Sequence, residues 1–434
     1  MKLNWFSPLL PERTDIAHYT ARLAPVLLQH FDVTFWTDLT FDARCLPPGA
    51  DVQEFDARTI DGRVFYSQLF AKLNVYNFGN DARFHAGIFQ VASKVPGLAV
   101  LHDTRLHHFF FELFRHGEPP WTEYIELAAR LYGRRGEVNA RQVVADKGRC
   151  IDELVEEMPF IEAIADNSIA VICHSKAAYD DIRRRSDAPV LMVPLPYEPL
   201  IRAAKVSRVW APPWRFVLFG YLNPNRRLES ILRALGGLRD RIDFRLDVFG
   251  TLWDRQVVET IVAREGLSSR VELHGFVSEQ TLDEAIGSAH LSFNLRYPTM
   301  GEASGGILRS WAHATPALVT DAGWYSDLPE TVAWKLPVAN EIAHVQESVS
   351  KLDAEPARFE AMGMAARRWL GESHSSDGYV EALGDALVDL PRLWTRRAGR
   401  KMLQQVAEEA RSRAERRVLL DRAARTASRL FSVG

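Results

Sequence analysis

Short apolar runs that alternate with amphipathic stretches constrain the fold of this chain most strongly. In the first half, the apolar runs that we interpret as buried strands are residues 3–6, 33–36, 98–102, 170–173 and 190–193. Helical patterns lie between them, as in residues 18–28 and 84–94. This order is typical of a parallel sheet covered by helices on both faces.

The alternation pauses over residues 194–215, a proline-rich stretch, and resumes with FVLFG at residues 216–220. The later strand-like runs are residues 244–249, 271–275, 291–295 and 317–320. We therefore predict two doubly wound α/β domains, residues 1–205 and 206–390. Ligands of open α/β sheets bind beyond the carboxyl ends of the strands, so two such domains predict a cleft lined by strand-end loops.

Composition limits the classes of protein to consider. The chain has 434 residues, 47% of them apolar and 25% charged, which suits two or three globular domains and excludes extensive disorder. The net charge of -3 gives no reason to expect nucleic acid as a partner. Cys45, Cys150 and Cys173 form neither a metal-ligand pattern nor a disulfide framework, which fits a reducing cytoplasm. Without a signal peptide or an apolar run of about 18 residues, we expect no membrane span.

The end of the chain, residues 391–434, is expected to be a helical tail. From residue 395 to residue 431 it carries eleven basic and four acidic residues, and Leu403, Val406, Ala410 and Ala414 recur at helical spacing. A basic amphipathic helix suits peripheral contact with the inner face of a membrane or with a partner helix. The alternative is a solvated helix packed on the protein's own surface.

The densest candidate site follows the strand-like run 291–295. Glu302 comes first, then Ser304, Gly305 and Gly306, and then an apolar helix from Ile307. Glycines before a helix leave unpaired N–H groups facing a ligand, which suits a phosphate or diphosphate, and Ser304 is a suitable N-cap. A simple helix start is the alternative. The carboxylate before the cap is placed to accept hydrogen bonds from a sugar attached to that diphosphate.

This segment resembles the donor-binding signature of the GT-B glycosyltransferases of family 4, which carry a Glu-x7-Glu pattern here. Further stretches resemble the family in the same order along nearly the whole chain: FSPLLPERTDIAHYTARL, YNFGN, PGLAVLHDTRLHHFF, VICHS, FGYLNPNRRLESILRAL and GFVSEQTLDEAIGSAHL. The resemblance implies two Rossmann-like domains facing a cleft, a C-terminal helical extension, and retaining transfer of a sugar from a nucleotide-sugar donor.

The resemblance also implies roles for single residues. Glu302 corresponds to the glutamate that contacts the hydroxyls of the donor sugar, and residues 304–306 would present N–H groups to the diphosphate. His102 corresponds to a histidine beside the donor sugar, whereas a lone strand-end histidine is otherwise a structural residue. Asp103 would orient its imidazole or cap the next helix.

Arg226 occupies the place of a basic residue that clamps the diphosphate, and Arg227 is its fallback. Negative charge builds on the leaving phosphate as the glycosidic bond breaks, and an arginine can neutralise it with two hydrogen bonds. The alternative is a pair of surface arginines at a helix N-terminus. That place is unfavourable for cations unless an anion is bound.

The opening loop and the strand before Arg226 depart from the family. Asp15 replaces a glycine, so its side chain stands where the backbone would approach phosphate. Asp15 and the adjacent Ile16 are both donor-binding candidates. Tyr221 replaces an arginine directly after Gly220, itself a donor-binding candidate.

The nucleotide-binding helix departs from the family too. Arg309 and Ser310 stand where a second, ribose-binding glutamate is expected, so nucleotide recognition by these two residues must differ. There is no Asp-x-Asp pair, so we expect no metal and no cofactor.

The resulting expectation is a hexosyltransferase that uses GDP-mannose or a UDP- or dTDP-sugar. The acceptor would be a glycan or a lipid-linked molecule, bound around residues 121–132, in bacterial surface polysaccharide or glycoconjugate synthesis. Two alternatives remain: a nucleotide-sugar 2-epimerase of the same fold, and a catalytically degenerate protein that binds a nucleotide sugar or a partner. Domain closure is expected to hinge near residues 194–215.

Overall fold

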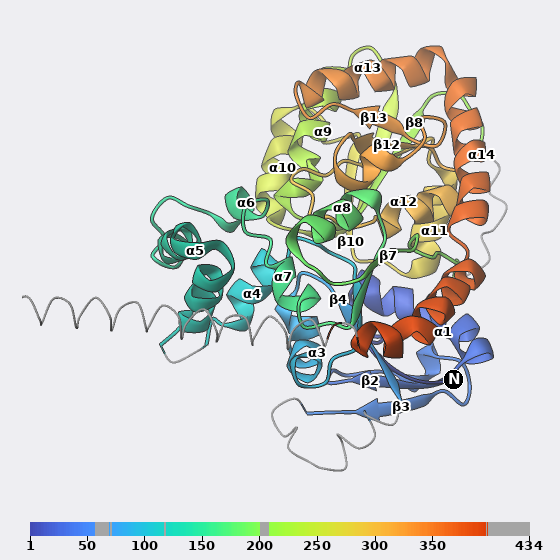
Figure 1. Ribbon diagram of the computed structural model, residues 1–434. Coiled ribbons are helices and arrows are strands. Elements are labelled where there is room, and N and C mark those ends of the chain that lie inside the picture. Colours follow the sequence, from blue (N-terminus) through green and yellow to red (C-terminus); the bar gives the residue numbers. More distant parts are fainter. Residues whose placement is uncertain (57–68, 70–71, 117–118, 200–207, 396, 398–434) are drawn as a thin grey trace, which may run out of the picture. The chain divides into compact units, whose positions relative to one another are not determined.

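A computed structural model describes residues 1–56, 69, 72–116, 119–199, 208–395 and 397 (Figure 1). The chain divides into two compact units, Met1–Gly384 and Asp385–Gly434. The first unit contains two separate parallel sheets with helices between their strands. This architecture confirms the predicted α/β fold with two doubly wound sheets, whereas the exact domain borders after residues 205 and 390 stay predictions.

The first sheet has the strand order β3-β2-β1-β4-β5-β6-β7, and each neighbouring pair is parallel. Its strands are β1 (Lys2–Phe6), β2 (Asp32–Thr37), β3 (Asp51–Glu54), β4 (Leu73–Phe78), β5 (Leu98–Leu101), β6 (Ala170–Cys173) and β7 (Val190–Met192). The helices described around it are α1 (Asp15–His30), η1 (Ala43–Cys45), α3 (Ala82–Lys94), α4 (His107–Leu113), α5 (Thr122–Val144), α6 (Ile151–Leu154), α7 (Ile161–Ala165) and α8 (Lys176–Arg185).

Adjacent residues of β1 show why residues 3–6 are buried throughout. Successive side chains of a strand point to opposite faces. Trp5 stacks on Tyr19 of α1 at 6.2 Å between ring centroids, and its Nε1 donates to Thr20 at 3.2 Å. Phe6 packs in a different cluster, with its ring 4.8 Å from Tyr76 of β4. Both faces of the sheet are therefore buried at its inner strand β1, as the apolar runs predict.

The five predicted strands of this sheet are present, but β3 and β4 were not predicted. Asn74 and Asn77 interrupt the apolar run of β4, although both are buried. Both are hydrogen-bonded to the neighbouring strand β1. Asn4 donates to Asn74 Oδ1 at 2.8 Å, and Asn77 donates to the Phe6 carbonyl at 3.0 Å. A buried polar side chain is tolerated when it is hydrogen-bonded, and apolar periodicity does not reveal such a strand.

The second sheet has the order β10-β9-β8-β11-β12-β13, again all parallel. Its strands are β8 (Trp214–Leu222), β9 (Phe244–Leu252), β10 (Val271–Gly275), β11 (Leu291–Asn294), β12 (Ala317–Thr320) and β13 (Trp334–Leu336). Its helices are η2 (Pro224–Arg226), α9 (Leu228–Gly236), α10 (Arg255–Arg264), α11 (Glu279–Ser288), α12 (Gly305–Ala312), η3 (Gly323–Asp327), α13 (Glu341–Ala354) and α14 (Pro356–Ser373). All strands but the three-residue β13 were predicted.

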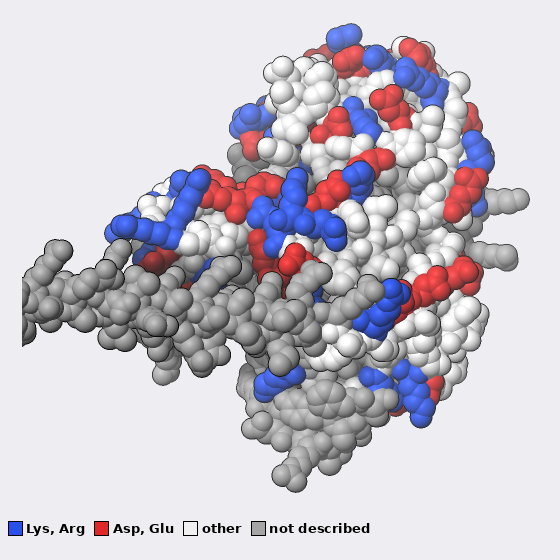
Figure 2. All heavy atoms as spheres, viewed as in Figure 1, with Lys and Arg blue, Asp and Glu red and all other residues white. Residues whose placement is uncertain are grey.

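Helices α9, α10 and α13 bury one face of this sheet, and α11 contributes to a smaller cluster on β8 and β9. The helical extension at the end of the chain consists of α14 and a further helix over residues 376–395. The predicted basic tail beyond residue 397 lies outside the described residues. Among the helices described, none is both long and apolar enough to cross a membrane. Acidic and basic side chains are interspersed on the face shown in Figure 2, in keeping with the small net charge.

Candidate functional site

Glu302 lies in the loop between β11 and α12, as predicted, and local contacts set its orientation. Its Oε2 accepts from the Met300 backbone N–H at 2.7 Å and from the Thr299 hydroxyl at 3.0 Å. Its Oε1 forms an ion pair with the guanidinium of Arg296. Only 11% of the Glu302 side chain is exposed. The carboxylate is thus held in one position at the carboxyl end of a central strand.

The start of α12 is open to a ligand. Ser304 is the N-cap, and its hydroxyl accepts from the Ile307 N–H at 3.3 Å, which confirms the predicted cap. The helix begins at Gly305, two residues earlier than expected, so both glycines belong to its first turn. A Cβ at Gly305 would meet no atom within 4 Å. Because the first-turn N–H groups of a helix have no partner within the helix, this opening exposes donors to an anion.

Arg226 is not a surface residue. It ends η2 with 5% of its surface exposed, and its Nη2 donates to the Phe219 carbonyl at 3.2 Å. Its Nε has no hydrogen-bond partner, and no carboxylate of the described residues lies within ion-pair distance. Burial, together with the charge of Arg296, lowers the pKa of Arg226 to about 10. A buried cation without a counter-ion is costly, so this position favours a bound anion.

Arg227, the fallback for the same role, points elsewhere. Its Nε makes a 2.9 Å ion pair with Glu341 Oε1 at the start of α13, and that carboxylate is buried. The structure therefore separates the two neighbouring arginines: Arg227 is neutralised by the protein, and Arg226 is not.

Arg296 is the functional candidate that the sequence reasoning missed. It follows β11 and lies close enough to Arg226 and Asp103 to shift the pKa of both. The rule that useful residues come directly after the strands was available to identify it, since a single leucine separates it from the end of β11.

His102 follows β5 and is buried. The Asn77 amide N–H donates to the Phe6 carbonyl, so the Asn77 oxygen faces His102 and accepts from its Nε2 at 3.2 Å. Burial lowers the pKa of His102 well below its usual value, and the neighbouring His174 adds to this. The imidazole is therefore neutral, with Nδ1 left as an acceptor.

Asp103 neither orients His102 nor caps a helix, so both predicted roles are wrong. Its Oδ2 accepts from the Asn80 backbone N–H at 2.8 Å, and α4 has Leu106 as its N-cap, without a side-chain cap bond. Burial raises the pKa of Asp103 to about 6, although the Asn80 N–H and the charge of Arg296 oppose the rise.

The loops after β5 and β11 touch each other directly. The backbone N–H groups of Thr104 and Arg105 both donate to the Met300 carbonyl at 2.9 Å. A Cβ at Gly301, whose φ is +78°, would lie 1.8 Å from the Thr104 hydroxyl. This contact brings the strand end that carries His102 and Asp103 to the loop that carries Glu302, as the two-sheet prediction requires.

The opening loop also reaches the second sheet. Asp15 is the exposed first residue of α1, and its charge raises the pKa of Arg226. The Ile16 side chain is buried, and its Cδ1 would lie 2.7 Å from a Cβ at Gly79, so it packs on the strand end. Gly220, with φ of +111°, has open space around its Cα, and the next residue, Tyr221, donates from its hydroxyl to the Arg13 carbonyl.

Arg309 and Ser310 use their polar groups within the protein. Arg309 is buried and pairs with Asp283 at 2.7 Å and with Glu279 at 2.9 Å, both on α11. The fully buried Ser310 donates from its hydroxyl to Ser292 at 3.0 Å. A ribose at either position would have to compete with these contacts.

Two other features lie apart from these loops. Among the described residues, Asp247, Glu272 and His274 place ligand atoms within 4.8 Å of one another on β9 and β10. His274 already bonds to Asp247 at 2.8 Å and stacks on Phe249, so the group is satisfied without a metal.

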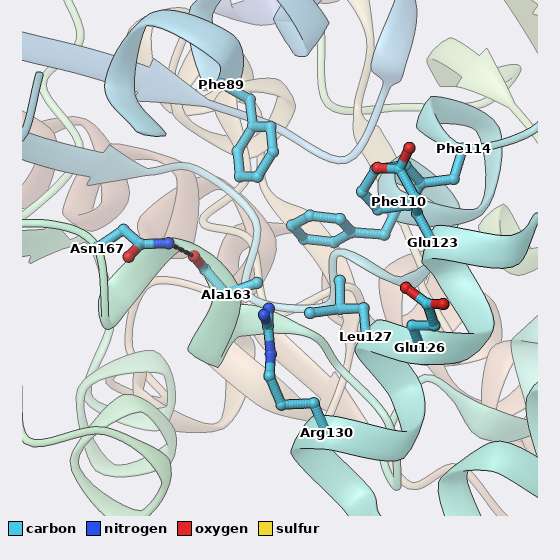
Figure 3. A pocket seen from close by; sticks show the side chains of 9 residues that line it. All are labelled: Phe89, Phe110, Phe114, Glu123, Glu126, Leu127, Arg130, Ala163 and Asn167. Carbon is cyan, nitrogen blue, oxygen red and sulfur yellow. Dashed lines mark hydrogen bonds between the residues drawn. The ribbon is translucent and has the colours of Figure 1, made fainter. Parts of the chain in front are cut away.

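A pocket of about 370 Å³ lies beside the first sheet. The rings of Phe89 and Phe110 and the guanidinium of Arg130 point into it, and Glu123 and Glu126 of α5 lie at its side (Figure 3). It includes part of the segment 121–132 that was expected to contact an acceptor. Whether an acceptor binds there stays a prediction.

No family model and no curated protein matches this sequence. Solved structures do share its fold. A sucrose-phosphate synthase from Thermosynechococcus elongatus is 13% identical with a TM-score of 0.61, over 90% of this chain and 99% of that one. HepE from Anabaena, in complex with UDP and glucose, is 11% identical with a TM-score of 0.62, over 89% and 99%. A putative UDP-N-acetylglucosamine 2-epimerase from Listeria monocytogenes is 12% identical with a TM-score of 0.50, over 89% and 96%. The chain therefore has the two-domain α/β architecture of these enzymes, the GT-B fold.

Proposed function

We propose that this protein is a glycosyltransferase that moves a hexose from a nucleotide diphosphate sugar to a glycan or lipid-linked acceptor. The observation that carries the proposal is Arg226, a buried guanidinium without a carboxylate partner. It accompanies the uncovered start of α12 and the carboxylate of Glu302, which together suit a diphosphate joined to a hydroxylated sugar. The same fold holds UDP and glucose in HepE from Anabaena.

The chemistry assigned to these groups is stabilisation of the leaving group. As the glycosidic bond breaks, charge develops on the β-phosphate, and Arg226 and the α12 N–H groups neutralise it without a metal. We propose a retaining reaction of the family 4 type, in which the acceptor hydroxyl attacks from the face of the departing diphosphate. Its proton passes to a phosphate oxygen, so no side chain acts as a nucleophile. His102 lies at the end of β5, and Nδ1 of its neutral imidazole can accept a hydrogen bond from a hydroxyl of the sugar.

The test compares three variants for binding and transfer. A thermal-shift screen with UDP, GDP, dTDP and their sugars first identifies the donor, since a ligand stabilises the fold that binds it. Glu302→Gln and Arg226→Met are then expected to abolish transfer while circular dichroism shows an intact fold. Arg227→Lys is the control, because a lysine keeps the charge that pairs with the buried Glu341, and donor binding is expected to persist. Turnover at the wild-type rate in Arg226→Met would refute the proposal.

A nucleotide-sugar 2-epimerase is the second candidate, since the Listeria structure shares the fold. Incubation with the identified donor alone separates the two, because an epimerase alters the sugar without an acceptor. A degenerate binding protein is the third candidate. It would be established if the bound donor were neither transferred nor hydrolysed.

We also propose a cytoplasmic protein in bacterial surface polysaccharide synthesis, with the basic tail as its peripheral membrane contact. Binding to vesicles that contain anionic lipid, lost on deletion of residues 398–434, tests this location.

A further inference from the structure

The proposed function assigns the Glu302 carboxylate to the donor sugar, but in this structure that carboxylate forms an ion pair with Arg296. Arg296 Nη1 contacts Glu302 Oε1, and the other oxygen, Oε2, accepts from Thr299 and Met300. Oε1 accepts no hydrogen bond from Thr299 or Met300, and its partner is Arg296. A sugar hydroxyl can therefore reach Oε1 without competition only after the guanidinium has moved away.

Arg296 itself is incompletely satisfied in this state. Its side chain is 19% exposed, and its Nε is buried without a hydrogen-bond partner. A guanidinium carries five N–H donors, and the contact with Glu302 uses only part of them. A ligand with several oxygen atoms close together, as in a diphosphate, offers this side chain more partners than Glu302 does.

The neighbourhood of Arg296 indicates where such a ligand lies. Its charge lowers the pKa of Arg226, the buried arginine that lacks a carboxylate partner. The two like charges repel each other, and an anion bound between them would offset this repulsion. Arg296 follows the end of β11, and its ion pair with Glu302 holds it to the residue that lies two positions before the Ser304 cap of α12.

We propose that Arg296 exchanges partners when the donor binds, leaving Glu302 for the diphosphate and so freeing Glu302 Oε1 for the sugar. This inference rests on the proposed function, because it concerns the same donor site. It assigns Arg296 as the second cation of the diphosphate site and the ion pair as a lock on the unliganded state. Part of the free energy of diphosphate binding is then used to break this ion pair, which lowers the affinity of the protein for the diphosphate.

The exchange predicts that two variants change the affinity for nucleoside diphosphate in opposite directions. Calorimetric titration with UDP and GDP, which lack the sugar, measures this affinity. Arg296→Met is expected to weaken binding of the nucleoside diphosphate at least tenfold, because a cation is lost. Glu302→Gln is expected to tighten the same binding about threefold or more, because Arg296 is released. In the double variant the tightening should disappear, since no arginine remains to be released.

The outcomes separate this inference from the proposed function. If the wild-type protein binds none of UDP, GDP and dTDP in the screen, the proposed function fails. If it binds one of them but Glu302→Gln binds that nucleotide no more tightly, or the tightening persists in the double variant, the exchange is overturned. Circular dichroism and thermal unfolding verify the fold of each variant. Should Arg296→Met not fold, Arg296→Gln replaces it in both arms, since it removes the charge but keeps a polar side chain, and the same outcomes are expected.

Discussion

Replacing Asp103 by asparagine tests the electrostatics of the strand end beside the candidate site. The Asp103 carboxyl lies at the carboxyl end of β5, and burial raises its pKa to about 6. An asparagine keeps an oxygen that accepts from the Asn80 N–H, the bond seen at 2.8 Å. The substitution Asp103→Asn therefore removes the ionisation and little else.

The size and sign of the effect follow from the two pKa values. The pKa of an aspartate in an unfolded chain is about 3.9. The folded protein binds the proton more tightly, so Asp103 stabilises it most at low pH and loses that contribution as the pH rises from about 4 to about 6. A shift of about two pKa units corresponds to roughly 3 kcal/mol at most. The variant, which does not titrate here, should gain stability relative to the wild type over this window and keep the gain at higher pH.

Urea unfolding of wild type and variant from pH 4 to pH 8 measures this difference. Asp240→Asn is the matched control, because 84% of the Asp240 side chain is exposed, and its difference from the wild type should stay constant. If the Asp103→Asn difference also stays constant with pH, then Asp103 is not a buried carboxyl with a raised pKa, and the reasoning is refuted.

Three further substitutions test the backbone and the packing. Gly301→Ala should lower the free energy of unfolding by about 1 to 3 kcal/mol, because φ is +78° and the new methyl meets Thr104; unchanged urea midpoints would contradict this. Gly305→Ala should leave thermal stability equal or higher but weaken nucleoside diphosphate binding in calorimetry, because its methyl enters the open space before α12; undiminished binding would exclude this helix start as the phosphate site. Arg208→Lys should cost about 2 to 3 kcal/mol in urea unfolding, because Arg208 donates to the Ala314 and Gly287 carbonyls and to Thr315 Oγ1, and a lysine cannot reproduce that fork.

Local patterns in the sequence were sufficient for most of the fold. Ten of the strands could be located because most of them are short apolar runs that are largely buried, a property of neighbouring residues alone. The cap of α12 was predictable for the same reason, since Ser304 bonds to an N–H three residues away. The strand β4 was missed because its buried asparagines depend on partners far along the chain.

The site required partners that sequence spacing does not reveal. Arg226 and Arg227 are adjacent and chemically identical, yet only Arg227 meets a carboxylate, 114 residues further on, in Glu341. Asp103 lies next to His102 but accepts from the Asn80 N–H instead, a partner 23 residues earlier in the chain. Secondary structure follows from local periodicity, and the sequence therefore specified where the strands and the loop of Glu302 lie. Burial and the neutralisation of charge depend on long-range packing, and the three-dimensional fold alone established which arginine is left for an anion.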